Sequence, residues 1–219
     1  EMDYAVESID YENRRVYIRT PKGNMDVKLL GDNITDAYNT VTAVAALEEF
    51  GLTADAISRS FEKMQIAGTR FGCVEVNGRK IITDVAKGQN PIAVSRVCDF
   101  VRHEPGKKAV VLILDDYFDR QDSSENIAWF FDTDFEFLND PGITQIVVGG
   151  PRCMDMHLRL LMAGIPEEKI ICCDEEPDTE KYVDLNKAEH VYILHDIYTT
   201  QYARVIQKNL GEHLKKEGR

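Results

Sequence analysis

The chain has 219 residues, a net charge of −12 at pH 7 and a hydrophobic content of 43%. This length allows one large domain, or one domain with a piece of another, and the composition is typical of a globular protein. The excess of Asp and Glu argues against nonspecific binding to nucleic acids or anionic membranes, which attract Lys and Arg.

No apolar run in the sequence approaches membrane-spanning length, so we expect no integral membrane segment, and no signal peptide is recognisable. The five cysteines are odd in number and form no C-x-x-C pair, which disfavours a disulfide framework or a zinc ribbon. We expect reduced, structural thiols in a cytoplasmic protein. The opening Glu1-Met2-Asp3 leads directly into strand-like sequence, which suggests a fragment of a longer protein.

The first part of the chain predicts a small sheet followed by two helices. YAVESID, RRVYIRT and MDVKLL alternate apolar and polar residues and predict strands between positions 4 and 30, with Gly23 and Asn24 in a turn. Helices are expected at 37–50 and after Thr53, whose hydroxyl can cap the second helix. Three strands alone make a weak sheet, so this part suggests the edge of a larger domain.

From residue 68 the pattern becomes a regular alternation of strands and helices. Asn77-Gly78 is a strong signal for a two-residue turn in a hairpin. Strands are expected at 73–76, 80–84, 108–115, 144–149, 169–173 and 190–195. Helices are expected at 91–102, within 116–138, and at 152–163, 178–185 and 199–217. Apolar runs such as KAVVLIL indicate strands buried on both faces, so the prediction is an α/β fold with a doubly wound, mostly parallel sheet.

Arg70, Asp84 and Lys87 form the first candidate site. Open α/β sheets bind ligands outside the carboxyl ends of their strands, and Asp84 ends a predicted strand. A carboxylate there can accept hydrogen bonds from ribose hydroxyls, while Arg and Lys can bind phosphate oxygens. The three residues indicate a nucleotide site, with a surface ion-pair cluster as the alternative.

A second candidate is the acidic loop that follows KAVVLIL. It contains Asp115, Asp116, Asp119, Asp122 and Glu125. Carboxylates in such a loop suit metal binding, general base catalysis or the orientation of a partner's histidine. The alternative is a solvated loop in front of the next helix.

Three weaker signals favour structural interpretations. Gly149-Gly150-Pro151-Arg152 precedes a helix and could admit a phosphate, but a single Gly-Gly turn is a weak signal and the chain contains no P-loop. His195 and Asp196 could act as base and orienter, although a capped strand end is the favoured interpretation. The aromatic cluster before Asp132 favours a core helix with a polar outer face. The histidines lack metal-ligand spacing, so no metal site is predicted.

Several passages resemble Mur ligases. LLGDNITDAYNTVTAVAALEEFGLTADAISRSFEKMQIAGTRF resembles their linker-and-helix passage, and VNGRKIITDVAKGQNP resembles the strand that follows it. LDDYFDRQDSSENIAWFFDTDFEFL and VVGGPRCMDMHLRLLMAGI resemble segments of MurT-type members, with 129–136 the most specific element. The resemblance covers essentially the whole chain. It implies the end of a central ATPase domain over 1–67 and a Rossmann-like Mur ligase C-terminal domain over 68–219.

The resemblance also implies a function. MurT-type ligases use ATP and Mg²⁺ to phosphorylate the D-glutamate α-carboxylate of lipid II, a peptidoglycan precursor, and ammonia from a GatD-like glutaminase then displaces phosphate. Asn39 would contact adenine, and Arg70 and Asp84 would hold ribose and phosphate with Lys87 nearby. The phosphate cradle, the magnesium ligands and the family's zinc ribbon would lie upstream, so the fragment alone is expected to be inactive.

The chain departs from the MurT pattern in the acidic loop. The family donates an aspartate that completes the glutaminase's Cys-His pair, and here that position falls on Asn126. Glu125 or Asp122 could take the role, or the role is absent. This departure motivates the alternative of an amino-acid-adding Mur-type ligase. A second alternative is a non-catalytic nucleotide or protein interaction module.

Overall fold

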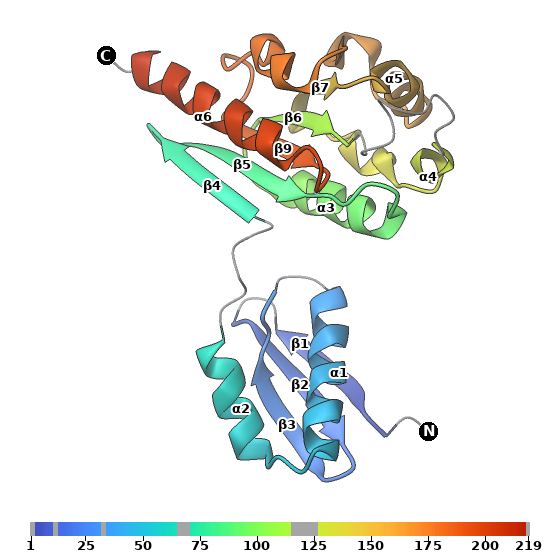
Figure 1. Ribbon diagram of the computed structural model, residues 1–219, viewed down its shortest axis with the longest axis vertical. Coiled ribbons are helices and arrows are strands. Elements are labelled where there is room, and N and C mark those ends of the chain that lie inside the picture. The colour runs from blue at the N-terminus through green and yellow to red at the C-terminus, as the bar shows by residue number, and fades with distance from the viewer. Residues whose placement is uncertain (1–2, 11–12, 32–33, 65–70, 115–126, 218–219) are drawn as a thin grey trace. The chain divides into compact units, whose positions relative to one another are not determined.

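A computed structural model describes residues 3–10, 13–31, 34–64, 71–114 and 127–217 (Figure 1). The chain forms two compact units, Glu1–Ala67 and Gly68–Arg219. That the first unit belongs to a central ATPase domain stays a prediction. None of the helices within the described ranges is long and apolar enough to cross a membrane.

The first unit is a three-stranded antiparallel sheet packed against two helices (Figure 1). Its elements are β1 (Ala5–Asp10), β2 (Arg15–Thr20), β3 (Gly23–Lys28), α1 (Ile34–Glu49) and α2 (Ala54–Lys63). Alternate residues of β2 and β3 point to one face and bury Val16, Ile18, Met25 and Val27 against the helices. Thr53 caps α2 as predicted, because its hydroxyl oxygen accepts a hydrogen bond from the Ala56 N–H at 3.3 Å.

One turn of this sheet lies two residues earlier than the sequence predicted. Thr20 pairs with Gly23 across the hairpin, so the turn is made by Pro21 and Lys22, and Asn24 is part of β3. Proline fixes the φ that the first central turn position needs. Gly23 has a φ of 129°, which explains why a glycine opens the strand.

The second unit contains a six-stranded sheet in the order β4-β5-β9-β6-β7-β8. The strands are β4 (Phe71–Val76), β5 (Arg79–Val85), β6 (Lys108–Ile113), β7 (Ile143–Gly149), β8 (Ile170–Cys173) and β9 (His190–His195). Five strands are parallel, and β4 joins antiparallel through the predicted hairpin, in which Asn77 and Gly78 have φ values of 52° and 77°. The predicted doubly wound, mostly parallel α/β fold is therefore confirmed.

Helices cover both faces of this sheet (Figure 1). They are α3 (Pro91–His103), α4 (Ala128–Phe131), η1 (Phe135–Leu138), α5 (Cys153–Met162), η2 (Glu167–Lys169), η3 (Glu176–Tyr182) and α6 (Thr200–Glu217). On one face α3, α4, η1 and α5 pack on Ile82, Leu112 and Tyr192, and on the other α6 packs on Ile81, Val111 and Ile193. Because both faces are covered, every residue of β6 is buried.

Two predicted helices are wrong. In the described part of 116–138 the expected core helix is replaced by α4 and the 3₁₀ turn η1. The helix does not continue to Asp134 because the Asp134 N–H and the Phe130 carbonyl, which would pair in an α-helix, instead bond the Ser95 hydroxyl at 2.8 Å and the Arg159 guanidinium at 2.9 Å. The helix expected at 178–185 is the 3₁₀ helix η3, whose three-residue period lets Glu176 and Thr179 share one buried face.

Candidate functional site

The loops after β5 and β9 diverge at the carboxyl edge of the sheet. These strands are hydrogen-bonded neighbours, yet β5 leads into α3 on one face and β9 leads into α6 on the other. This is a topological switch point, where neighbouring loops leave a crevice between them, and open α/β sheets bind their ligands in such a crevice.

A hollow of about 760 Å³ lies at this switch point. It is lined by Lys87, Gly88, Gln89, Asn90, Pro91, Ile92, Asp132, Asp196, Ile197 and Tyr198. The volume is within the range of small-molecule sites. The structure thus places Lys87 of the candidate nucleotide site in a ligand-sized space.

The hollow combines two exposed charges with exposed apolar surface. Lys87 supplies a cation and Asp132 an anion, and both side chains are exposed. Ile92 and Tyr198 are 77% and 58% exposed and supply apolar surface beside these charges. Lys87 suits a negatively charged ligand group such as a phosphate or carboxylate, and the surface around Tyr198 suits a planar or apolar ligand group.

The segment from Lys87 to Pro91 is held in a fixed conformation. The Asn90 side-chain oxygen accepts a hydrogen bond from the Ala93 N–H at 3.1 Å, and Pro91 occupies the first turn of α3, so this helix begins at the hollow. Gln89 adopts a φ of 57°, a region that residues other than glycine enter at a cost. Strain of this kind is concentrated at ligand sites.

The other predicted nucleotide residues have different placements. Asp84 is half-buried in β5, paired with Phe71 and Leu194, and is not among the residues that line the hollow. Asn39 is exposed on α1 in the first unit. Arg70 lies outside the described residues. The roles expected of these three residues stay predictions.

The predicted catalytic loop cannot be placed. Its members, Asp116, Asp119, Asp122, Glu125 and Asn126, all lie outside the described residues, as does Asp115. In the part of the chain that the structure describes, no group of three or more His, Cys, Asp or Glu side chains could hold a metal ion.

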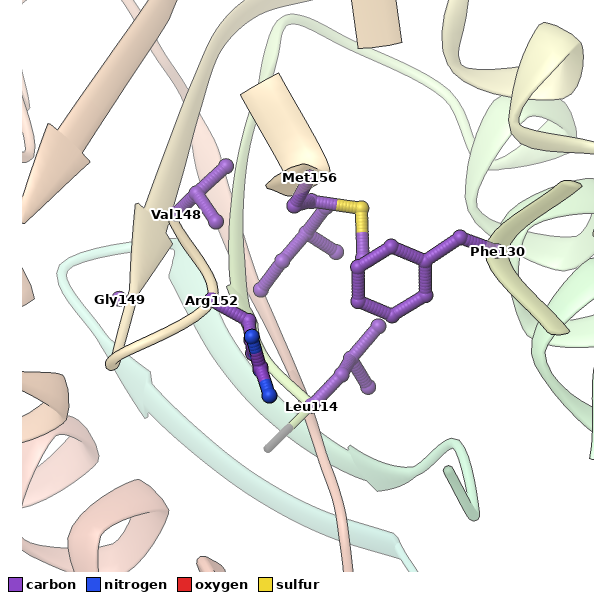
Figure 2. A pocket seen from close by; sticks show the side chains of 7 residues that line it. Leu114, Phe130, Val148, Gly149, Arg152 and Met156 are labelled. Carbon is purple, nitrogen blue, oxygen red and sulfur yellow. The ribbon is translucent and has the colours of Figure 1, made fainter. Parts of the chain in front are cut away.

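A second opening at the same edge, beside β6 and β7, is filled. Its volume is about 10 Å³, enough for no more than one water molecule, and Figure 2 shows Leu114, Phe130 and Met156 pointing into it. Arg152 lies at its side and forms a 3.6 Å ion pair with Asp155. Gly149 at this turn packs closely against η3, since a Cβ there would lie 2.3 Å from a Thr179 methyl carbon, which supports a structural interpretation of this glycine.

A buried arginine, Arg159, holds in place the segment that contains Asp132. Arg159 is 5% exposed and donates to the Phe130 and Thr133 carbonyls at 2.9 and 2.7 Å and to both Glu136 carboxylate oxygens. This guanidinium holds the pKa of Glu136 below its usual value. The aromatic-acidic cluster of the sequence is thus an arginine-anchored turn beside the hollow.

His195 and Asp196 do not form a base-and-orienter pair. The His195 ring nitrogen Nδ1 lies 2.8 Å from the backbone carbonyl of Asp196, not from its carboxylate. Burial lowers the pKa of His195 and favours the neutral ring. The structure therefore supports the structural interpretation of His195.

The five cysteines are free thiols. Burial raises the pKa of Cys98 and raises the pKa of Cys153 to about 12. Such thiols are protonated at neutral pH and are poor nucleophiles, in keeping with structural roles.

Sequence reasoning did not assign Asp132, Asp196 or Tyr198 to a ligand site, although all three line the hollow. It considered Asp196 only as an orienter of His195 and Asp132 only on the polar face of a core helix. Asp196 and Tyr198 follow β9 directly, and the strand-end rule that selected Asp84 and Lys87 applies equally to them. Asp132 has no such signal, because only the anchored turn brings it to the hollow.

Solved structures share this architecture. A MurF crystal structure from Acinetobacter baumannii aligns with a TM-score of 0.69 at 18% identity, covering 96% of this chain and 45% of that chain. MurF from Thermotoga maritima in complex with ADP aligns with a TM-score of 0.60 at 20% identity, covering 98% of this chain and 47% of that one. The strand order and these alignments define the Mur ligase fold.

Sequence comparisons identify the family within this fold. The family model described as MurT ligase C-terminal matches residues 88–200. The MurT subunit of lipid II isoglutaminyl synthase (glutamine-hydrolyzing) from Staphylococcus aureus strain COL is 29% identical over 181 residues, 83% of this chain and 40% of that protein. The subunit of the same name from Streptococcus pneumoniae strain R6 is 27% identical over 72% of this chain and 34% of its own length. The chain belongs to the MurT ligase family and spans less than half the length of these relatives.

Proposed function

We propose that this chain is the C-terminal part of an ATP-dependent amide-forming ligase of peptidoglycan precursor metabolism, and that the hollow at the ends of β5 and β9 faces the nucleotide. The observation that carries the proposal is the position of Lys87, an exposed cation in a 760 Å³ hollow at the switch point of a Mur ligase fold. Membership of the MurT family supports the choice of substrate class.

The proposed reaction has two steps. A substrate carboxylate, in the favoured case the D-glutamate α-carboxylate of lipid II, attacks the γ-phosphorus of ATP and forms an acyl phosphate and ADP. Ammonia then attacks the acyl carbon, phosphate leaves, and a proton is lost to give the amide. Lys87 would neutralise developing negative charge as a compact cation. The sequence contains no P-loop, so the main phosphate cradle and the Mg²⁺ ligands belong to other parts of the protein.

Arg70, Asp84 and Asn39 remain the proposed ribose, phosphate and adenine residues. Because the phosphate cradle and the Mg²⁺ ligands are proposed to belong to other parts of the protein, we predict that the 219-residue chain alone has no ligase activity. Turnover of ATP and precursor by the isolated chain would contradict it.

The source of the ammonia is proposed to be a GatD-like glutaminase subunit. The relatives carry the words glutamine-hydrolyzing and subunit in their names. A surface suited to a protein partner is present on α5, where large apolar side chains recur at helical spacing: Met154, Leu158, Leu161 and Met162 are 65%, 57%, 38% and 62% exposed. Phe131 of α4, which packs against α5, is 51% exposed. A cytoplasmic location of the complex is part of the same proposal, because ATP and the proposed precursor are supplied there.

Nucleotide binding is tested with Lys87→Ala in the complete protein. Isothermal titration with a non-hydrolysable ATP analogue should show binding weaker by about tenfold, the loss of roughly 1.4 kcal/mol of charge attraction. Lys107→Ala is the matched control, since Lys107 is an exposed lysine at the opposite end of β6. Equal affinities for both variants and the parent would favour the non-catalytic module.

The partner is tested with Leu158→Glu. Co-purification of the complete protein with its co-expressed glutaminase should be lost, while circular dichroism stays unchanged. Val205→Glu, at a 47% exposed position on α6, should retain the partner. Amide formation is then assayed with glutamine plus partner, with ammonium, and with free amino acids. Product that requires a free amino acid would favour the amino-acid-adding ligase.

A further inference from the structure

Asp196 is a buried carboxylate that joins two loops from distant parts of the chain. It is 3% exposed. Its Oδ2 accepts a hydrogen bond from the Gly88 N–H at 2.6 Å, across 108 residues of sequence, and its Oδ1 accepts one from the Tyr198 N–H at 3.1 Å. Both oxygens are therefore used by backbone donors, one on each side of the hollow.

The bond to Gly88 sets the position of the Lys87 loop. Gly88 follows Lys87 directly, and a Cβ at this position would lie 3.0 Å from Asp196 Oδ2 and 3.0 Å from the Leu114 carbonyl oxygen. Glycine thus permits the close approach of the loop to the carboxylate.

The bond to Tyr198 lies within the loop between β9 and α6, which also lines the hollow. The loop between β9 and α6 is further fixed by Thr199, whose hydroxyl donates to the Ile113 carbonyl at 2.7 Å and accepts from the Asp196 N–H at 3.0 Å. The Asp196 side chain accordingly leaves a well-anchored strand end and reaches across to the neighbouring loop.

A carboxylate is the side chain that this geometry requires. Asparagine of the same shape offers one acceptor oxygen, so its NH₂ group would face the N–H of either Gly88 or Tyr198 and leave that donor unpaired. Hydrogen bonds to an ionised acceptor are also about twice as strong as neutral ones.

We propose that Asp196 is a positioning residue of the nucleotide-facing hollow: by binding the Gly88 and Tyr198 amides at once, it fixes Lys87 at the distance from Tyr198 that the ligand requires. The inference rests on the proposed function and adds a residue to it. The proposed role of Asp196 is exerted through these two backbone hydrogen bonds and requires no contact of its carboxylate with the nucleotide.

The test is a double-mutant cycle between Asp196→Asn and Lys87→Ala in the complete protein. The affinity for a non-hydrolysable ATP analogue is measured by isothermal titration, and the Michaelis constant for ATP is measured separately from kcat. Asp196→Asn should weaken binding about tenfold and raise the Michaelis constant more than it lowers kcat. In the Lys87→Ala background the same substitution should have little further effect, because the cation it positions is gone.

Each outcome of these measurements supports or contradicts the proposed positioning role of Asp196. If Asp196→Asn leaves the affinity unchanged, or weakens it equally with and without Lys87, Asp196 has only a structural role. If Lys87→Ala binds the ATP analogue as tightly as the parent, the proposed nucleotide-binding role of the hollow is contradicted. The inference about Asp196, which rests on that role, is then contradicted as well. Should Asp196→Asn fail to fold, Gly88→Ala displaces the same bond with the carboxylate intact and must give the same pattern. Asp184→Asn, in the η3–β9 connection, is the control and should bind normally.

Discussion

At the carboxyl edge of the six-stranded sheet, the opening beside β6 and β7 is filled by side chains, whereas the opening beside β5 and β9 is about 760 Å³. Phe130 and Met156 close the first (Figure 2). In the second, the lining loops lead to helices on opposite faces of the sheet and are tied to each other by the hydrogen bond from the Gly88 N–H to Asp196. The open part of this edge is therefore the part where neighbouring strands lead to helices on opposite faces of the sheet.

Phe130→Ala, at the filled opening beside β6 and β7, should have the largest effect on stability. Phe130 is 4% exposed, and removing its ring should lower the free energy of unfolding by about 3–5 kcal/mol, because the cavity cannot fully close. Urea denaturation measures the change. Phe131→Ala, at a 51% exposed neighbour, is the control and should cost less than about 1 kcal/mol. Equal effects would show that the opening is not part of the core.

Arg159→Ala should have the next largest effect. The Phe130 and Thr133 carbonyls lose their donors at a buried position, which costs about 1–3 kcal/mol for each group left unpaired. Thermal unfolding measures the loss of stability, and titration with the ATP analogue shows whether the Asp132 turn matters for the open hollow. Arg159→Lys should recover little, since an ammonium cannot reproduce the planar fork. Full recovery by lysine would contradict this account.

Asn90→Ala, compared with Thr53→Ala, separates the effect of helix capping on stability from the effect of the hollow on nucleotide binding. Loss of the cap should cost about 1 kcal/mol of stability and also weaken nucleotide binding, because Asn90 lines the hollow. Thr53→Ala removes an equivalent cap from α2 in the first unit and should cost a similar amount without the binding defect. Calorimetry and titration of both variants provide the check. The same binding loss in both would mean that the hollow is not involved.

The smallest effect is a pH dependence at His195. Burial lowers its pKa in the folded state, and the nearby Arg204 acts in the same direction, so the unfolded chain binds the proton more readily. Stability is therefore fully present above the unfolded pKa of about 6.5 and declines as pH falls towards the folded pKa. His195→Gln should reduce this slope in urea melts between pH 7 and 5. His213→Gln, at an exposed position on α6, should leave it unchanged.

Much of the fold follows from local sequence. The apolar runs predicted the buried strands, Asn77-Gly78 predicted the hairpin, and Thr53 and Asn90 mark the starts of helices. Errors arose where tertiary contacts override local pattern. The bonds of Ser95 and Arg159 end the helix expected before residue 138, and the buried face of η3 favours a 3₁₀ period over an α-helical one.

The candidate site was only partly predictable. Strand-end reasoning pointed to Lys87, which lines the hollow. It gave no means of knowing that β9, the last strand in sequence, inserts beside β5, since strand order depends on long-range packing. Without that order, the approach of Asp196 to Gly88 cannot be foreseen.

The central position of β9 bears on how the protein is made. Because β9 lies between β5 and β6, a nascent chain that has emerged only as far as β8 has two unsatisfied inner strand edges. Late, long-range pairing of this kind slows folding and exposes the intermediate to aggregation. The hollow consequently forms only after β9 and the loop that follows it have been synthesised, and a ribosome-bound chain stopped before residue 190 should still lack it.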